Sequence, residues 1–321
     1  MLNSRIVRSI FYLLTFGVLV HCLFAYTAIP FFRFLGMDFQ NLHAFHHCTH
    51  ANAPYLLEGD VCNDVANRAM LYPPLLYWAF YWTRFFDFQT AYYLQVALLS
   101  GSLLGSFVLL WLAFGASRYF LPKSPRGLLV AASLFWLLLM GSMPFLFSLE
   151  RGNTDSLVVL LWCGALYCFV SKRFFAWGAI SAVAILFKLY PVFPSVVVGS
   201  GFLAHLLFGR KHEYQSLFYA ICGGLIVAGL VIGLTIESHF IYFQQVLPLF
   251  ADRNVGTNQY AHTVLSLESV YPGLSLWVRV GLVLAWCVLS FRRILTDAPL
   301  VFAGGLAMST FFSGTSYDYN L

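Results

Sequence analysis

Long apolar stretches separated by short polar segments dominate the pattern of this chain. A helix that crosses a bilayer needs about 20 apolar residues, and nine charge-free stretches reach or approach that length. They cover residues 9–32, 88–117, 127–149, 156–171, 174–187, 189–209, 216–236, 280–291 and 298–312. The pattern therefore predicts an all-α polytopic membrane protein, with about nine transmembrane helices in a single domain over residues 1–321.

Another apolar segment, "AMLYPPLLYWAFYWT" at residues 69–83, is too short for a span, and Pro73 and Pro74 remove two backbone donors from it. We expect a short helix that lies in the membrane interface or dips into it from one face. Residues 33–87 then form one long first loop with short interfacial helices, and residues 237–275 form a late loop on the same side. The aromatic residues expected at headgroup depth are Tyr72, Tyr77, Trp78 and Trp82.

Composition supports the membrane assignment. The 321 residues are 60% hydrophobic and only 10% charged, whereas a soluble domain carries about 25% charged residues. The net charge of +5 comes with no basic run that would indicate nucleic acid, so we expect membrane lipids and no nucleic acid among the partners.

The distribution of basic residues predicts the topology. Eleven of the eighteen Lys and Arg residues, but only two of the thirteen acidic ones, fall at alternate gaps between the expected spans. Because cytoplasmic loops are rich in Lys and Arg, these gaps are expected to be cytoplasmic, together with the N-terminus. Nearly all other polar residues then lie on the extracytoplasmic side, where we expect the working surface.

The stretch "DFQNLHAFHHCTH" opens the first extracytoplasmic loop. Asp38 suits a helix N-cap, and it also suits a general base held near the membrane. The histidines follow the spacing i, i+3, i+4, i+7, which places them on one stripe of a helix. A metal site is open to them in principle, but no glutamate of the HExxH kind lies between them, so we expect no metal and favour an acceptor-facing or interfacial surface. The histidines are His43, His46, His47 and His50.

The turn "FSLERGNTD" joins two expected spans. Glu150 and Arg151 could simply pair at the interface, and Asn153 or Thr154 could cap the next helix. Neither explanation accounts for Asp155, which lies inside the following short span. A charge at that depth is tolerated where it faces a watery cavity or another charge.

Lys188 in "FKLYPVFP" is likewise a single charge at the end of a short apolar span. A lone lysine between apolar stretches can extend its ammonium to the interface. Followed by Tyr190 and a proline, it could instead bind a phosphate at the mouth of a cavity.

The seven cysteines form no CxxC pair, and five of them lie in apolar stretches. Cys48 and Cys62 both fall in the first loop, where an oxidising compartment would allow them to pair. Cys48 is also the thiol closest to the histidine stripe.

The order of these motifs resembles that of the superfamily C glycosyltransferases. It is similar more narrowly to family 87, the mannosyltransferases that use polyprenyl-phosphate sugars. The likeness runs from Asp38 through "YPPLLY", "ERGNTDSLVVLLWCGAL" and "AWGAISAVAILFKLYPVFP" to "SGTSYDYNL" at the end.

The resemblance implies an inverting hexosyltransferase, with mannose the expected sugar, whose donor is a polyprenyl-phosphate sugar and whose acceptor is a glycan or glycolipid. Asp38 would be the catalytic base, and Arg151, Lys188 and Arg279 would bind the donor phosphate. No cofactor is expected, and the location implied is the bacterial inner (plasma) membrane, with the active site outside. The expected cavity residues are Tyr72, Pro73, Pro74, Glu150, Asn153, Asp155, Tyr190, Asn254, Ser316 and Asp318.

Two features depart from the family. Its members carry aromatic and small residues after the aspartate rather than four histidines, which points to a different acceptor side. The chain also ends at "SYDYNL", where relatives continue into further helices, as expected of a truncated product. The rival function is a transporter or flippase of a lipid-linked substrate, but no inverted repeat is visible in the sequence.

Overall fold

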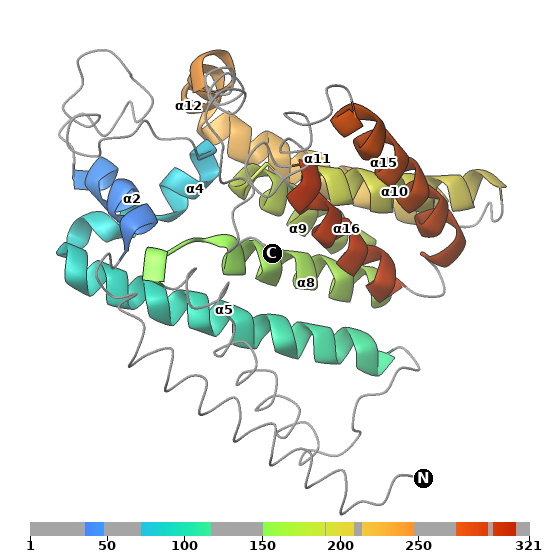
Figure 1. Cartoon of the computed structure of the whole chain (residues 1–321), viewed down its shortest axis with the longest axis horizontal. Helices are drawn as coiled ribbons and strands as arrows, with labels where there is room; N and C mark the ends of the chain where they lie inside the picture. The colour runs from blue at the N-terminus through green and yellow to red at the C-terminus, as the bar shows by residue number, and fades with distance from the viewer. Residues whose placement is uncertain are drawn as a thin grey trace, which may run out of the picture.

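The computed structural model describes most of the expected helices and the short elements that pack at one end of them. Every regular element in the described part of the chain is helical (Figure 1). The expected spans at 9–32 and 127–149 lie outside it. The described residues are 36–47, 72–116, 150–189, 191–208, 214–246, 274–294 and 298–312.

Seven of the expected spans are helices, and most of their boundaries lie within three residues of the prediction. Only α15 begins clearly earlier, because Arg279 interrupts the charge-free stretch without interrupting the helix. Two of the seven, over Phe88–Leu110 and Tyr214–Leu234, are long and apolar enough to cross a membrane. The helices are α5 (Phe88–Ala116), α8 (Asp155–Val170), α9 (Phe174–Phe187), α10 (Val192–Phe208), α11 (Tyr214–Leu234), α15 (Leu274–Arg293) and α16 (Ala298–Phe312).

The helices pack side by side around an aromatic core. Helix α8 lies between α5 and α9, α9 packs on α11, and α10 packs on α15 and α16. Trp162 of α8 is buried and donates its indole N–H to the carbonyl of Phe302 in α16 at 3.0 Å. This bond satisfies a buried donor and fixes α16 against α8.

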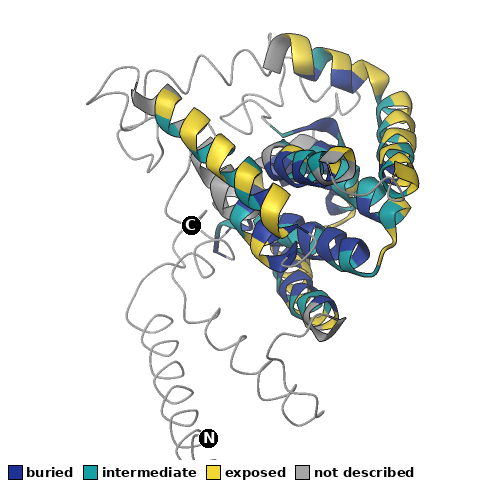
Figure 2. Cartoon of the chain, turned by 90° about the vertical axis from the view of Figure 1, so that its right-hand side faces the viewer, coloured by how far each residue is buried: buried dark blue, intermediate teal, exposed yellow. Residues whose placement is uncertain are grey.

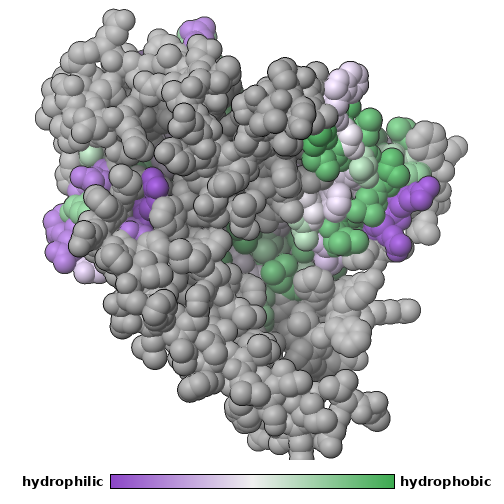
Figure 3. All heavy atoms as spheres, in the orientation of Figure 1, coloured by the Kyte–Doolittle hydropathy of each residue, from purple (hydrophilic) through white to green (hydrophobic). Residues whose placement is uncertain are grey.

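The outward faces of these helices are apolar. Leu225 and Leu234 of α11 are 68% and 85% exposed, and exposed residues run along the outer helices (Figure 2). Apolar side chains also gather over α10 and α15, with polar ones at the edge beside them, and another polar group lies near α2 and the start of α5 (Figure 3). An exposed apolar helix face of this kind suits lipid contact rather than water.

The first loop contributes short helices, as the sequence predicts. These are α2 (Met37–His47), α4 (Pro74–Ala79) and the 3-10 helix η2 (Tyr81–Phe85). Pro74 occupies the first position of α4, where its missing N–H breaks no helical bond. Tyr77 is the exception to the expected headgroup position, because its side chain is fully buried in the protein.

Candidate functional site

The polar site is built on the turn that precedes α8, where α2 and α5 contact it. The backbone N–H of Gly36 donates to the carbonyl of Glu150 at 2.6 Å. From α5, the Tyr92 hydroxyl donates to the same carbonyl at 3.2 Å, and Gln95 Nε2 donates to the carbonyl of Gly152 at 3.3 Å. The turn is therefore held by both neighbours rather than hanging as a free loop.

Close contact between α2 and the turn requires Gly152. Its φ is +70°, and a Cβ placed there would lie 2.6 Å from the Cβ of Phe39. Gly36 has a φ of +71° and contacts the turn through its N–H. Asp38 lies between Gly36 and Phe39 in the first turn of α2, so its backbone is next to a turn that follows more than 110 residues later.

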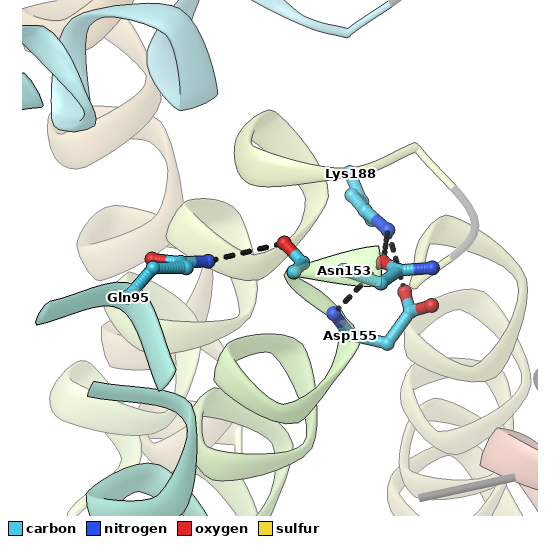
Figure 4. A network of polar contacts seen from close by, with 5 residues as sticks. Gln95, Asn153, Asp155 and Lys188 are labelled. Atoms are coloured by element: carbon cyan, nitrogen blue, oxygen red, sulfur yellow. Dashed lines mark hydrogen bonds and ion pairs between the residues drawn. The ribbon is translucent and has the colours of Figure 1, made fainter. Parts of the chain in front are cut away.

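Lys188 forms an ion pair with Asp155, which is one of the two outcomes that the short spans left open. Its Nζ lies 2.6 Å from Asp155 Oδ1 and donates to Asn153 Oδ1 at 3.0 Å (Figure 4). The side chains of Lys188 and Asp155 are 12% and 23% exposed. An ammonium has three donors, and these two bonds leave one of them for another ligand. Tyr72 lies close by, with its ring centroid 5.6 Å from Nζ.

Asn153 takes the capping role at the start of α8. Its Oδ1 accepts the backbone N–H of Asp155 at 3.3 Å as well as the Lys188 ammonium. Thr154 occupies the N-cap position but makes no capping bond with its side chain. The sequence left both residues open for this role, and the structure assigns it to Asn153.

Glu150 carries a buried carboxyl group, 8% exposed. Burial raises its pKa, and the positive charge of Arg151 acts in the opposite direction. Its Oε2 has no hydrogen-bond partner among the described residues. Buried acceptors of this kind normally bind water or a ligand.

The histidines of α2 contact aromatic residues of the first loop. His43 Nε2 lies 3.0 Å from the carbonyl oxygen of Phe86. The His46 ring stacks on Tyr77 at 4.3 Å between centroids. Within the described part of the chain, no group of three or more His, Cys, Asp or Glu side chains is placed to hold a metal ion.

The remaining predicted residues are distributed as follows. Pro73 and Pro74 are buried at the start of α4, while Arg279 lies on α15, which packs on α10 and α16. His47 lies in the last turn of α2. The predicted residues outside the described part are His50, Cys48, Cys62, Tyr190, Asn254, Ser316 and Asp318.

Sequence reasoning missed Tyr92 and Gln95, which hold the turn from α5. The signal for Gln95 was present, because an amide inside an otherwise apolar span must find a hydrogen-bond partner. Tyr92 gave no such signal, since tyrosine is common near the ends of membrane helices.

Comparison with known proteins adds a family assignment. The model of glycosyltransferase family 87 matches residues 70–314, which is most of the chain and includes the turn and Lys188. The match begins after α2, so Asp38 lies outside it. No curated protein and no solved structure matches.

Proposed function

The chain belongs to glycosyltransferase family 87, and on that premise we propose that it is a membrane hexosyltransferase that uses a polyprenyl-phosphate sugar. The sugar proposed is mannose, and the acceptor is a glycan or glycolipid at the extracytoplasmic face of a bacterial inner membrane. Helices with exposed apolar faces, together with a polar network at one end of α8 and α9, support a donor that stays in the lipid.

The observation that carries the proposal is the contact between α2 and the turn before α8. The bond from Gly36 to Glu150, together with the Phe39–Gly152 contact, places the backbone of Asp38 beside the polar turn. This contact supports a site in which the proposed base and the proposed phosphate-binding residues act on one substrate, although they are more than 110 residues apart in the sequence.

In the proposed reaction, Asp38 accepts the proton of the acceptor hydroxyl as its oxygen attacks C1 of the sugar. The bond between C1 and the phosphate oxygen breaks, the electron pair stays on the lipid phosphate, and the configuration at C1 inverts. The third donor of Lys188 and the guanidinium of Arg151 stabilise the charge that develops on that phosphate, with Arg279 as a further proposed contact.

The pairing with Asp155 shapes the role of Lys188. The carboxylate compensates most of the ammonium charge, so Lys188 acts as an oriented hydrogen-bond donor, and the guanidinium of Arg151 adds positive charge beside it. Asn153 and Asp155 thus position Lys188, and this arrangement lowers the energy lost to reorientation when the phosphate arrives.

A transporter or flippase is the weaker alternative. It would need a substrate path that reaches both membrane faces, whereas the polar network of the described residues lies at one end of the helices. Family membership also favours an enzyme that transfers sugar.

The test is a transfer assay on membranes that contain the full chain, supplied with polyprenyl-phosphate [14C]mannose, the matching glucose lipid, or GDP-[14C]mannose. We expect label to leave only the mannose lipid and to appear on a glycan or glycolipid product. The Asp38→Asn variant should lose about 10²–10⁴-fold in rate.

The matched control is Asp87→Asn, the same substitution at an exposed carboxylate that caps α5 through Thr90. An asparagine can still cap the helix, so this variant should transfer sugar normally. Efficient transfer from GDP-mannose in the absence of lipid donor would overturn the proposed donor, and normal turnover by Asp38→Asn would remove Asp38 from the reaction.

A further inference from the structure

The first polar contact of the histidine stripe ties α2 to the segment just before α5. A carbonyl oxygen can only accept, so His43 donates from Nε2 to Phe86 at 3.0 Å. The His43 ring also meets Phe88 edge-on, at 5.5 Å between centroids. One face of α2 is thereby joined to the chain at the entrance to α5.

His46 makes the second contact, which is with buried aromatic rings. The imidazole is 1% exposed, stacks on Tyr77 of α4 with an interplanar angle of 24°, and meets Tyr81 of η2 edge-on at 5.8 Å. Burial raises the pKa of the Tyr77 hydroxyl to about 12, with the charge of Arg84 opposing the shift. The His46 and Tyr77 side chains are both buried where the two rings meet.

These contacts matter because α2 is short. A helix of 11 residues is marginal on its own in water, so its direction is set by what it packs against. Gly36 and Phe39 attach its first turn to the site. His43 attaches a later turn to Phe86 and Phe88 at the start of α5, and His46 attaches it to α4 and η2. Asp38 lies in the first turn of α2, between Gly36 and Phe39. The direction of Asp38 relative to the site therefore depends on the orientation of the whole helix.

We propose that His43 and His46 are positioning residues, which hold α2 against α4, η2 and the start of α5 and so fix the direction from which Asp38 reaches the acceptor hydroxyl. This inference rests on the proposed role of Asp38. Neither imidazole touches substrate. These two histidines thus act as a clamp that joins α2 to α4, η2 and the start of α5.

The experiment compares substitutions that keep each contact with substitutions that remove it, in the full chain in membranes or lipid nanodiscs. His43→Gln keeps an N–H donor for the Phe86 carbonyl, and His43→Leu does not. His46→Phe keeps a ring to stack on Tyr77, and His46→Ala does not. Because a misplacement of about 1 Å can reduce a rate by about 10², we expect the two disruptive variants to lose up to that factor in kcat.

The two conservative variants should retain at least a third of the wild-type kcat, and KM for the lipid donor should stay unchanged throughout.

Amide hydrogen exchange supplies a readout that does not depend on activity. The disruptive variants should exchange faster in α2 while α8 and α9 keep their protection. Equal kcat in His43→Leu and His43→Gln, or unchanged α2 exchange in His46→Ala, would overturn the inference.

The control is His239→Leu, which removes a buried histidine whose polar contacts stay within its own short helix, to Thr235. It should leave α2 exchange unaltered. Failure of the proposed function is recognised separately: Asp38→Asn would then keep its turnover, while faster exchange in the disruptive histidine variants would still show that the clamp exists.

Discussion

The buried pair between Lys188 and Asp155 makes the sharpest prediction, because it separates a structural role from a functional one. Lys188→Met removes the ammonium and keeps an unbranched apolar stem, which leaves the Asp155 carboxylate 23% exposed and without the 2.6 Å contact. Exposed ion pairs contribute about 0–1 kcal/mol, whereas removing one partner of a fully buried pair costs about 3–5 kcal/mol.

The pair lies between these limits, since its side chains are 12% and 23% exposed. We therefore expect Lys188→Met to lower the free energy of unfolding by about 2 kcal/mol. Asp155→Asn should cost less, about 1 kcal/mol, because Lys188 keeps amide oxygens as acceptors at both positions.

The double variant leaves no unpaired charge and should cost only about as much as Asp155→Asn alone. The coupling energy between the two positions is then about 2 kcal/mol, well above the error of such a cycle. Unfolding can be followed by tryptophan fluorescence in detergent, with sugar transfer measured on the same preparations. Lys172→Met, the same substitution at an exposed lysine, is the control for loss of a positive charge.

Stability and transfer should diverge in the double variant. It regains about half of the stability lost in Lys188→Met, but it lacks the third N–H donor proposed for the lipid phosphate, so transfer should stay low. Additive costs in the cycle would refute the coupling argument. Wild-type transfer by a stable double variant would refute phosphate binding by Lys188.

Three further predictions address the turn, the helix packing and the buried acid. Gly152→Ala should cost at least about 2 kcal/mol, from the left-handed backbone and the contact with Phe39, and should abolish transfer; an active, stable variant in unfolding and transfer assays would contradict this. Gly178→Ala should reduce the yield of folded protein on size-exclusion chromatography, because its Cβ would clash with a backbone carbonyl of α11, whereas Gly229→Ala has open space and should be neutral. Glu150→Gln should raise the Tm at pH 7: burial raises the pKa of this carboxyl above 4.5, so its ionisation destabilises the fold as pH rises, and the gain should vanish below pH 4.5 in a Tm series against pH.

Much of the helical framework follows from the sequence, because charge-free length is a direct consequence of burying a helix in lipid. That criterion placed α5, α8 and α9 almost to the residue. It failed at the start of α15, since one arginine ends a charge-free stretch but costs a helix little.

The sequence predicted contacts within the site only for residues that are close along the chain or that share a physical requirement, such as offsetting a charge near the membrane. Asp155 and Lys188 lie at the ends of short spans, where each charge had to face water or the other charge. The two side chains form an ion pair with each other. The partners of His43 and His46 could not be found in this way. Their contacts depend on how two short helices cross, and a stripe on one helix does not say which of many aromatic residues it meets.

The turn before α8 explains why the same residues assemble both the fold and the site. Irregular backbone near a membrane must satisfy its own polar groups, and the carbonyls of Glu150 and Gly152 do so with donors from Gly36, Tyr92 and Gln95. Those three donors come from two other segments of the chain, so satisfying the turn necessarily brings α2 and α5 against it. The Gly36 bond that helps to make this irregular turn tolerable is therefore also the bond that brings the Asp38 helix against it, while the bonds from Tyr92 and Gln95 do the same for α5, so removing either side-chain donor should loosen the turn.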